Sequence, residues 1–158
     1  MEQKELIIDG NSKKVFATDD PDKVIIHYTD MANAYHYIKK AVIRRKGLAT
    51  CKISALVYNY LRQNGIESHF IEQTGDRDLL CKKVKFIPMK VIVRNIAAGT
   101  MAERLGLNEG ACLFRPVFEL CYKNKTLGDP LINNGHAAAL GLASYEELEE
   151  IHRHTARI

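Results

Sequence analysis

The sequence predicts an α+β fold with a mainly antiparallel sheet and a few helices. Short runs rich in β-branched residues follow one another near the start of the chain and are separated by turn residues. Apolar residues recur at helical spacing once in the first half of the chain and again near its end. With 158 residues, 46% of them hydrophobic, the chain has the size of one globular domain that can bury its own core.

The first elements are predicted to be a β-hairpin and a third strand. Residues 5–9 and 13–18 are β-rich runs joined by the turn residues Gly10, Asn11 and Ser12. The apolar run 24–28 follows as the third strand.

A helix is expected next, followed by three strands. The apolar positions at helical spacing are Ile53, Leu56, Val57, Tyr60 and Leu61, and Gly65 ends the helix. We expect this helix to lie across the sheet. Strands are predicted at 69–71, 84–87 and 91–93, and Pro88 and Met89 separate the last two.

The end of the chain is predicted to combine helices with one more strand. Residues 100–105 form a short helix closed by Gly106, and residues 114–122 form a strand that leads into a turn at 124–126. Ser144 and Glu147 form a capping box for a final helix from Tyr145. No repeat or linker interrupts the chain, so we expect a single domain over residues 1–158.

Composition excludes several classes of protein. The N-terminus lacks the basic start and apolar run of a signal peptide, and no run of about 18 apolar residues occurs, so we expect no membrane partner. The four cysteines are Cys51, Cys81, Cys112 and Cys121, with no C-x-x-C pair. This spacing predicts reduced core residues in a cytoplasmic protein and argues against zinc.

Basic residues gather in two clusters although the net charge is only +4. One cluster lies within residues 39–46 and the other within residues 82–90. Such clusters suit phosphate groups. A duplex-binding module would be more basic and would carry a known motif, so nucleic acid is not an expected partner.

One long motif resembles a known enzyme family. Residues 94–106 read R-N-I-A-A-G-T-M-A-E-R-L-G and closely resemble the R-N-x-A-A-G-S-x-x-x-R-x-G stretch of the phosphoribosylaminoimidazole-succinocarboxamide synthase (SAICAR synthetase) family. Further matches follow the family's order: Gly10–Phe16, Lys52–Leu56, Asp76-Arg77 before Lys82-Lys83, Pro88, Lys123 and Asp129–Asn133. The resemblance covers nearly the whole chain.

This resemblance implies an activity and a division of the chain. The family joins the carboxylate of a phosphoribosyl aminoimidazole to aspartate with ATP and magnesium, through an acyl phosphate, in a cleft between two lobes of an ATP-grasp or kinase-like fold. By resemblance, residues 1–87 are the hairpin-containing, ATP-facing lobe and residues 88–158 begin the second lobe.

The resemblance also implies binding residues. A glycine turn followed by lysine lets backbone N–H groups and a point charge approach phosphate, and an arginine beside a helix start offers a forked anion site. Residues 87–89 resemble the adenine-binding hinge, and Tyr37 lies beside the implied cleft. The implied nucleotide and phosphate site comprises Gly10, Ser12, Lys13, Tyr37, Lys83, Met89, Lys90, Arg94, Gly99, Thr100, Lys123 and Asp129. Without the resemblance, the turn would be a plain hairpin, and Arg94 a surface residue near an N-cap threonine.

The sequence departs from the family at several points. Asn11 stands in place of the first hairpin lysine, and Lys90 in place of a glutamate. The loop 30–37 replaces D-D-A-T-A-F-N-G with D-M-A-N-A-Y-H-Y. The family's magnesium-binding acids follow a helix like 145–158, so we expect this chain to lack them and hence most of the catalytic rate.

These departures favour one hypothesis and leave others open. The first is a non-catalytic protein, with no catalytic residue and no required cofactor, that sequesters a small phosphorylated nucleotide as a homodimer. An extension of it is a viral decoy for a cyclic dinucleotide in the host cytoplasm. The alternative is a fragment or split subunit of an ATP-dependent SAICAR synthetase of purine biosynthesis that uses ATP and Mg²⁺. A third is a regulatory subunit that docks on an intact synthetase and binds no nucleotide.

Overall fold

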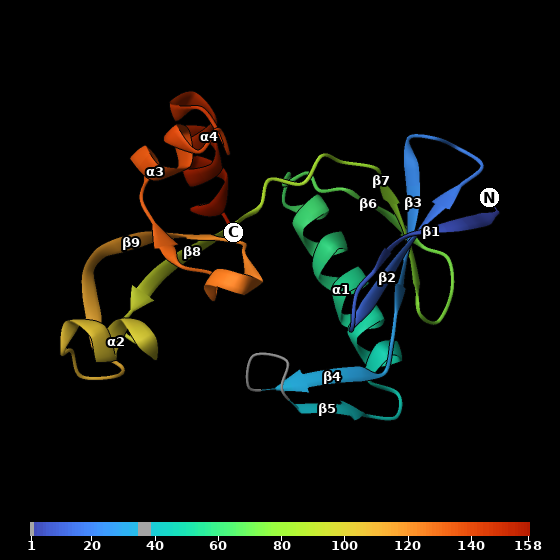
Figure 1. The fold of residues 1–158 in the computed structure, drawn as a ribbon, viewed down its shortest axis with the longest axis horizontal. Coiled ribbons are helices and arrows are strands. Elements are labelled where there is room, and N and C mark those ends of the chain that lie inside the picture. Colours follow the sequence, from blue (N-terminus) through green and yellow to red (C-terminus); the bar gives the residue numbers. More distant parts are fainter. Residues whose placement is uncertain (1, 35–38) are drawn as a thin grey trace. The chain divides into compact units, whose positions relative to one another are not determined.

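The computed structural model describes residues 2–34 and 39–158 and divides into two compact units, Met1–Lys85 and Phe86–Ile158. This boundary lies two residues before the one expected at 87/88. Among the described residues, the first unit combines antiparallel sheets with helix α1, and the second combines one antiparallel sheet with several helices (Figure 1). The predicted α+β class is therefore confirmed.

The first unit is built on a five-stranded antiparallel sheet. Its order is β1 (Gln3–Asp9), β2 (Lys13–Thr18), β3 (Lys23–Tyr28), β7 (Asp78–Lys82) and β6 (Phe70–Gln73). The predicted hairpin and third strand are thus confirmed. A separate two-stranded sheet pairs β4 (Met31–Ala34) with β5 (Lys39–Val42).

Helix α1 (Lys46–Gln63) packs on this sheet through small side chains. Cys51 and Ala55 are buried against a core formed by Val24, Tyr28, Phe70, Leu79 and Cys81. Small residues on the inner face let the helix approach the sheet closely, and Tyr58 fills the space beside Phe70 at a ring distance of 5.4 Å. The helix ends before Gly65, whose φ of 71° suits glycine.

The helix lies across the sheet as expected, but the apolar positions that predicted it do not face the sheet. Ile53, Leu56 and Tyr60 are 63%, 70% and 64% exposed. A step of two residues turns a helix by about 200°, so residues 53 and 57 lie nearly opposite the inward-facing 51 and 55. The outer apolar residues form a stripe, which we call the α1 stripe: Ile53, Leu56, Val57 and Tyr60.

The prediction of a strand at 84–87 was also wrong. Residues 83–88 form no regular element, and Val84 and Phe86 are exposed. The strand lies earlier, at β7, where the apolar run Leu79–Cys81 pairs with β3 on one side and β6 on the other. Charged residues at both ends of β7 leave an apolar run of only three residues, which is too short to predict a strand. Met89 does not break a strand either, because it begins the next one.

The second unit contains a three-stranded antiparallel sheet with helices. Its strand order is β10 (Leu131–Ile132), β9 (Cys112–Tyr122) and β8 (Met89–Ile96). The helices are α2 (Thr100–Leu105), the 3₁₀ turn η1 (Lys125–Leu127), α3 (Asn134–Ala139) and α4 (Tyr145–Thr155). The predicted helix closed by Gly106 and the capping box at Ser144 are both confirmed.

The two faces of the β8–β9 ribbon have different character. Met89 and Leu120 pack with Ala137, Ala143 and Leu148 in the core beneath α3 and α4. Because side chains alternate along a strand, Lys90, Ile92 and Arg94 lie on the other face, together with their cross-strand neighbours Cys121, Glu119 and Val117. The charged residues Lys90, Arg94 and Glu119 therefore lie on the face away from this core.

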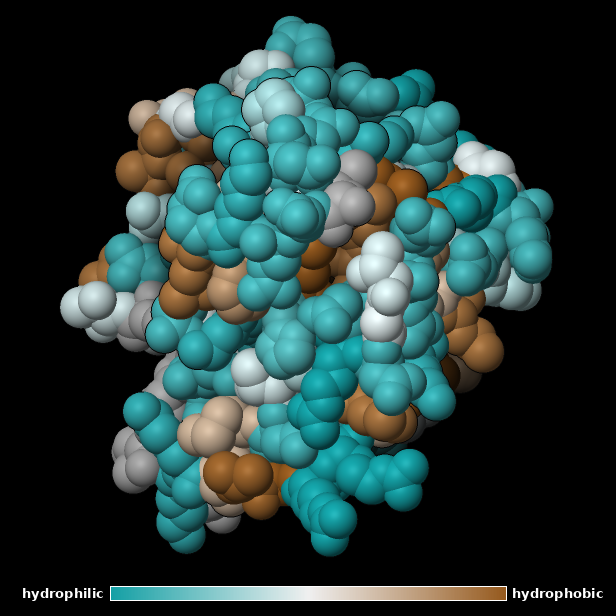
Figure 2. All heavy atoms as spheres, turned by 90° about the vertical axis from the view of Figure 1, so that its right-hand side faces the viewer, coloured by the Kyte–Doolittle hydropathy of each residue, from teal (hydrophilic) through white to brown (hydrophobic). Residues whose placement is uncertain are grey.

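The cysteines are mostly core residues, as predicted. Cys51, Cys81 and Cys121 are buried, whereas Cys112 is exposed, and all four are free thiols. On the face of the molecule shown in Figure 2, hydrophilic side chains cover most of the surface and apolar ones form separate patches.

Among the described residues, no helix combines the length and the apolar character that crossing a membrane requires.

Candidate functional site

The hairpin turn of the first unit is fixed to the end of β3. Thr29 donates a side-chain hydrogen bond to the carbonyl of Asn11 at 2.6 Å, and its amide donates to the carbonyl of Ser12 at 3.0 Å. A Cβ on Gly10 would lie 2.6 Å from the Lys13 carbonyl oxygen, so only glycine fits. Lys13 is exposed, with its ammonium 5.0 Å from the centre of the Tyr28 ring. Gly10, Ser12 and Lys13 thus lie together at this turn.

Lys83 lies far from this turn. Lys13 pairs with Tyr28 at one end of β3, whereas Lys82 pairs with Lys23 at the other end. Five steps of about 3.4 Å along β3, from Lys23 to Tyr28, separate the two ends by roughly 17 Å. The structure therefore does not bring Lys83 to the Gly10 turn.

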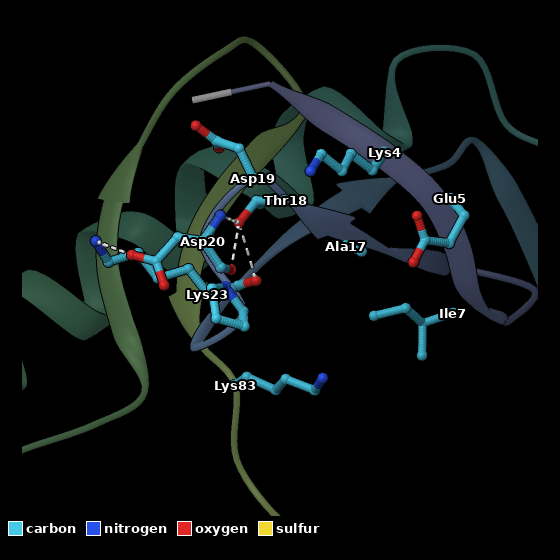
Figure 3. A pocket seen from close by; sticks show the side chains of 10 residues that line it. Lys4, Glu5, Ile7, Ala17, Thr18, Asp19, Asp20, Lys23 and Lys83 are labelled. Atoms are coloured by element: carbon cyan, nitrogen blue, oxygen red, sulfur yellow. Dashed lines mark hydrogen bonds and ion pairs between the residues drawn. The ribbon is translucent and has the colours of Figure 1, made fainter.

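Lys83 instead lines a shallow pocket of about 340 Å³ (Figure 3). The pocket is lined by Lys4, Glu5, Ile7, Ala17, Thr18, Asp19, Asp20, Pro21, Lys23 and Lys83. Three lysines face three acids, and Lys23 is paired with Asp20 at 2.8 Å. This balance of charge gives the pocket no preference for an anion.

Asp30 anchors the start of α1. Its carboxylate accepts hydrogen bonds from Arg77 at 2.7 and 2.9 Å, and from the amides of Gly47 at 2.8 Å and Arg45 at 3.2 Å. The Arg77 guanidinium and the Gly47 amide hold the pKa of Asp30 well below its usual range. This carboxylate is committed to the fold.

In the second unit, two arginines share one carboxylate. Glu119 of β9 accepts a hydrogen bond from Nε of Arg94 on β8 at 2.8 Å, and its other oxygen accepts one from Arg104 on α2. The Glu119 side chain is only 8% exposed. Burial by itself would raise the pKa of Glu119, but the hydrogen bonds from Arg94 and Arg104 outweigh burial and lower it. We call these three residues the arginine cluster.

Arg94 also reaches the loop before α2. Its Nη1 atom donates to the carbonyl of Ala98 at 3.4 Å. The next residue, Gly99, has φ 54° and ψ −137°, which favour glycine, and its amide donates to the Glu109 carboxylate at 3.1 Å. Thr100 begins α2 and is exposed. Arg94 on β8 therefore contacts the short loop that contains Gly99 and leads to Thr100, and a carboxylate occupies the Gly99 amide.

Lys90, Lys123 and Asp129 form a second charged group. Lys123 pairs with Asp129 at 3.0 Å, and the pairing lowers the pKa of Asp129, to which Lys90 also contributes. The Lys123 amide donates to the Pro88 carbonyl at 2.8 Å, and Met89 donates to the carbonyl of Ile87 at 2.7 Å. One buried oxygen of Asp129, Oδ1, has no hydrogen-bond partner among the described residues. These residues thus meet at the start of β8.

The sequence did not identify two members of the arginine cluster as site residues. One residue that it assigned to the site is not described by the structure. Arg104 is the second arginine of the 94–106 motif, so the motif could have identified it as a site residue. Glu119 lies inside a predicted strand, and its place on the same face as Arg94, opposite Ile92, depends on the strand register. Tyr37 lies outside the described residues.

Over residues 2–34 and 39–158, no three acidic, histidine or cysteine side chains cluster closely enough to hold a metal ion. Glu119 and Asp129 are each paired with cations. The described residues therefore do not form a magnesium site by themselves.

The fold is that of the SAICAR synthetases, an α+β class of enzyme structures. The crystal structure of phosphoribosylaminoimidazole-succinocarboxamide synthase from Ehrlichia chaffeensis aligns with a TM-score of 0.91 at 35% identity, over 97% of this chain and 65% of that one. A SAICAR synthetase in complex with ADP aligns with a TM-score of 0.88 at 38% identity, over 96% and 64%.

The chain belongs to the SAICAR synthetase family, whose model matches residues 6–158. The phosphoribosylaminoimidazole-succinocarboxamide synthase of Fusobacterium nucleatum is 49% identical over 158 residues, which are all of this chain and 67% of that protein. The chain thus spans about two thirds of the length of such relatives.

Proposed function

We propose that this chain is the ATP-binding and substrate-phosphate-binding portion of a SAICAR synthetase, an ATP-dependent ligase of purine biosynthesis. The observation that carries the proposal is the 49% identity to a synthase over every residue of the chain. The ADP complex among the solved structures, at 38% identity, supports nucleotide binding in particular.

The two units would bind two different phosphates. In the first unit, the Gly10 turn leaves backbone room for phosphate oxygens, and exposed Lys13 supplies a positive charge for the phosphates of ATP. In the second unit, Arg94 would bind the phosphate of the ribotide substrate with a forked guanidinium that Glu119 holds in place.

Two variants separate these roles. We expect Lys13→Gln to weaken binding of ADP at least tenfold and to leave binding of an aminoimidazole ribotide unchanged. Arg94→Gln should have the opposite effect, because it removes the forked donor of the other phosphate. Isothermal titration calorimetry of both ligands on both variants measures this. Failure of the wild-type chain to bind either ligand, or an equal loss of both ligands in each variant, would refute the proposal.

A second candidate is metal-free sequestration of a nucleotide by a homodimer, the first hypothesis from the sequence. Lys90 and Lys123 beside Asp129 favour it, because ammonium groups attract an anion and oppose a divalent cation. The relatives are named as synthases and support the synthetase proposal better than sequestration. Cyclic dinucleotide binding without metal, no ADP release from ATP and Mg²⁺, and a dimer by sedimentation would favour sequestration. Magnesium-dependent ADP release would favour the synthetase.

A further inference from the structure

The arginine cluster holds two positive charges at a fixed separation. Each oxygen of Glu119 accepts a hydrogen bond from a different arginine, so one carboxylate sets the positions of both guanidinium groups. The carboxylate lies on β9, Arg94 on β8 and Arg104 on α2. Three elements therefore converge on one small charged group.

The cations of the cluster are more accessible than its anion. The side chain of Glu119 is 8% exposed, whereas those of Arg94 and Arg104 are 22% and 43% exposed. Among the described residues, Nη2 of Arg94 and both Nε and Nη1 of Arg104 donate no hydrogen bond. An anion arriving from solvent would thus meet unused N–H donors, with the carboxylate behind them.

Helix α2 holds Arg104 in this position. Met101 and Ala102 are buried beneath the helix, and Gly106 closes it in the left-handed conformation with φ 64°. The short helix is therefore fixed at both its inner face and its end. Arg104 reaches Glu119 from a rigid backbone, which limits the entropy lost when an anion binds.

The cluster carries one net positive charge. Nearby, the Glu109 carboxylate on the Gly99 amide offsets that charge. Affinity for an anion therefore depends on directed hydrogen bonds rather than on net charge. Two fixed guanidinium groups suit an anion that has several oxygens and a double charge, because each can form a charge-assisted pair.

We infer that Arg104 is a second anion-binding residue, which together with Arg94 makes this site selective for a phosphate monoester dianion over a singly charged oxyanion. The inference rests on the proposed function, because that function supplies the phosphate-bearing substrate. Glu119 acts as a positioning residue that holds both arginines.

The test compares two ligands of the same shape and different charge. Ribose 5-phosphate and ribose 5-sulfate are titrated into the full chain at pH 7.5 by isothermal titration calorimetry. We expect the wild-type protein to prefer the phosphate at least tenfold. Arg104→Gln should lose at least tenfold in phosphate affinity and bind both ligands about equally.

Two further variants complete the design. Arg104→Lys keeps the positive charge but loses the planar guanidinium donors, so it should keep only part of the preference for phosphate. Arg153→Gln changes the same charge on α4, where Arg153 is 71% exposed and pairs with Glu150 at 3.4 Å, and should behave as wild type. Thermal unfolding by circular dichroism identifies any variant that fails to fold, in which case Arg104→Lys alone decides.

The outcomes are distinct. If Arg104→Gln prefers phosphate as strongly as the wild type does, the inference is overturned. If Arg94→Gln nevertheless loses binding of the phosphate ligand, the proposed function stays intact. A wild-type chain that binds ADP but neither ribose ligand would overturn the inference and keep nucleotide binding. A chain that binds none of the three would overturn both.

Discussion

Arg77 and Asp30 hold the first turn of α1 against the sheet by a two-point ion pair, with hydrogen bonds of 2.7 and 2.9 Å. They lie 47 positions apart in the sequence and join the end of β3 to the loop before β7. The Gly47 amide donates to the same carboxylate. A single acidic side chain thus connects three segments of the first unit.

This pair predicts a loss of stability in acid. The pKa of Asp30 is lowered in the folded state by Arg77, so its contribution is complete above the ordinary carboxyl value of about 4 and is lost as pH falls further. We expect Asp30→Asn to lower the melting temperature at pH 7 and to reduce its fall between pH 4 and 2. Calorimetric scans across this range measure both effects. An unchanged melting temperature at pH 7 would contradict the assignment.

Gly47 should tolerate no side chain. A Cβ there would lie 2.5 Å from the Tyr28 carbonyl oxygen and 2.7 Å from Nη1 of Arg77. Because the first of these atoms belongs to the backbone, we expect Gly47→Ala to cost about 3 kcal/mol, at the upper end for overpacking. Urea unfolding measures this, with Lys52→Ala on the exposed face of α1 as the control. A loss in Gly47→Ala no larger than in the control would show that the loop can move aside.

Glu119 should matter for stability as well as for binding. Replacing it with Gln removes the charge from two hydrogen bonds and leaves two guanidinium groups next to each other. We expect Glu119→Gln to lower the free energy of unfolding by about 2 kcal/mol. Chemical denaturation at pH 7 tests this, with Glu150→Gln on α4 as the matched control. Equal stability of both variants would mean that the cluster is not held by charge.

Lys90 should control affinity for divalent cations. In Lys90→Glu, a carboxylate would replace the ammonium that helps to lower the pKa of Asp129, so this pKa should rise and Mg²⁺ should bind more tightly. Lys90→Gln removes the charge without adding an acid and should fall between wild type and Lys90→Glu. Titration calorimetry with MgCl₂ measures the affinities. Identical Mg²⁺ affinities in all three proteins would remove the argument for metal-free binding.

The thiols should react very unequally. Burial raises the pKa of Cys81 to about 11, so almost no thiolate forms at pH 8. Cys112 is exposed. We expect one fast reaction with a disulfide reagent in the folded protein and four in denaturant. Cys112→Ser should abolish the fast reaction, and fast labelling that persists in this variant would show that a buried cysteine is accessible.

The sequence predicted elements well where local chemistry determines them. The Gly10 turn, the Ser144 capping box and the Gly106 helix end each depend on a few neighbouring residues. Prediction failed where the outcome depends on distant pairing: β7 has only three apolar residues, and the inner face of α1 is set by Cys51 and Ala55, which fit close to the sheet. Within the site, the 94–106 motif located Arg94, but the partnership with Glu119 required the register of β8 and β9.

The α1 stripe affects how the solubility of the protein depends on salt. Residues 31–66 contain seven lysines and arginines and no acidic residue, so copies of the chain repel one another through this region in dilute buffer. Salt at 1 M shortens the range of that repulsion to about 3 Å, while the exposed apolar side chains keep their tendency to leave water. Solubility should therefore decrease as salt is added, and low ionic strength is the condition in which concentrated samples stay clear.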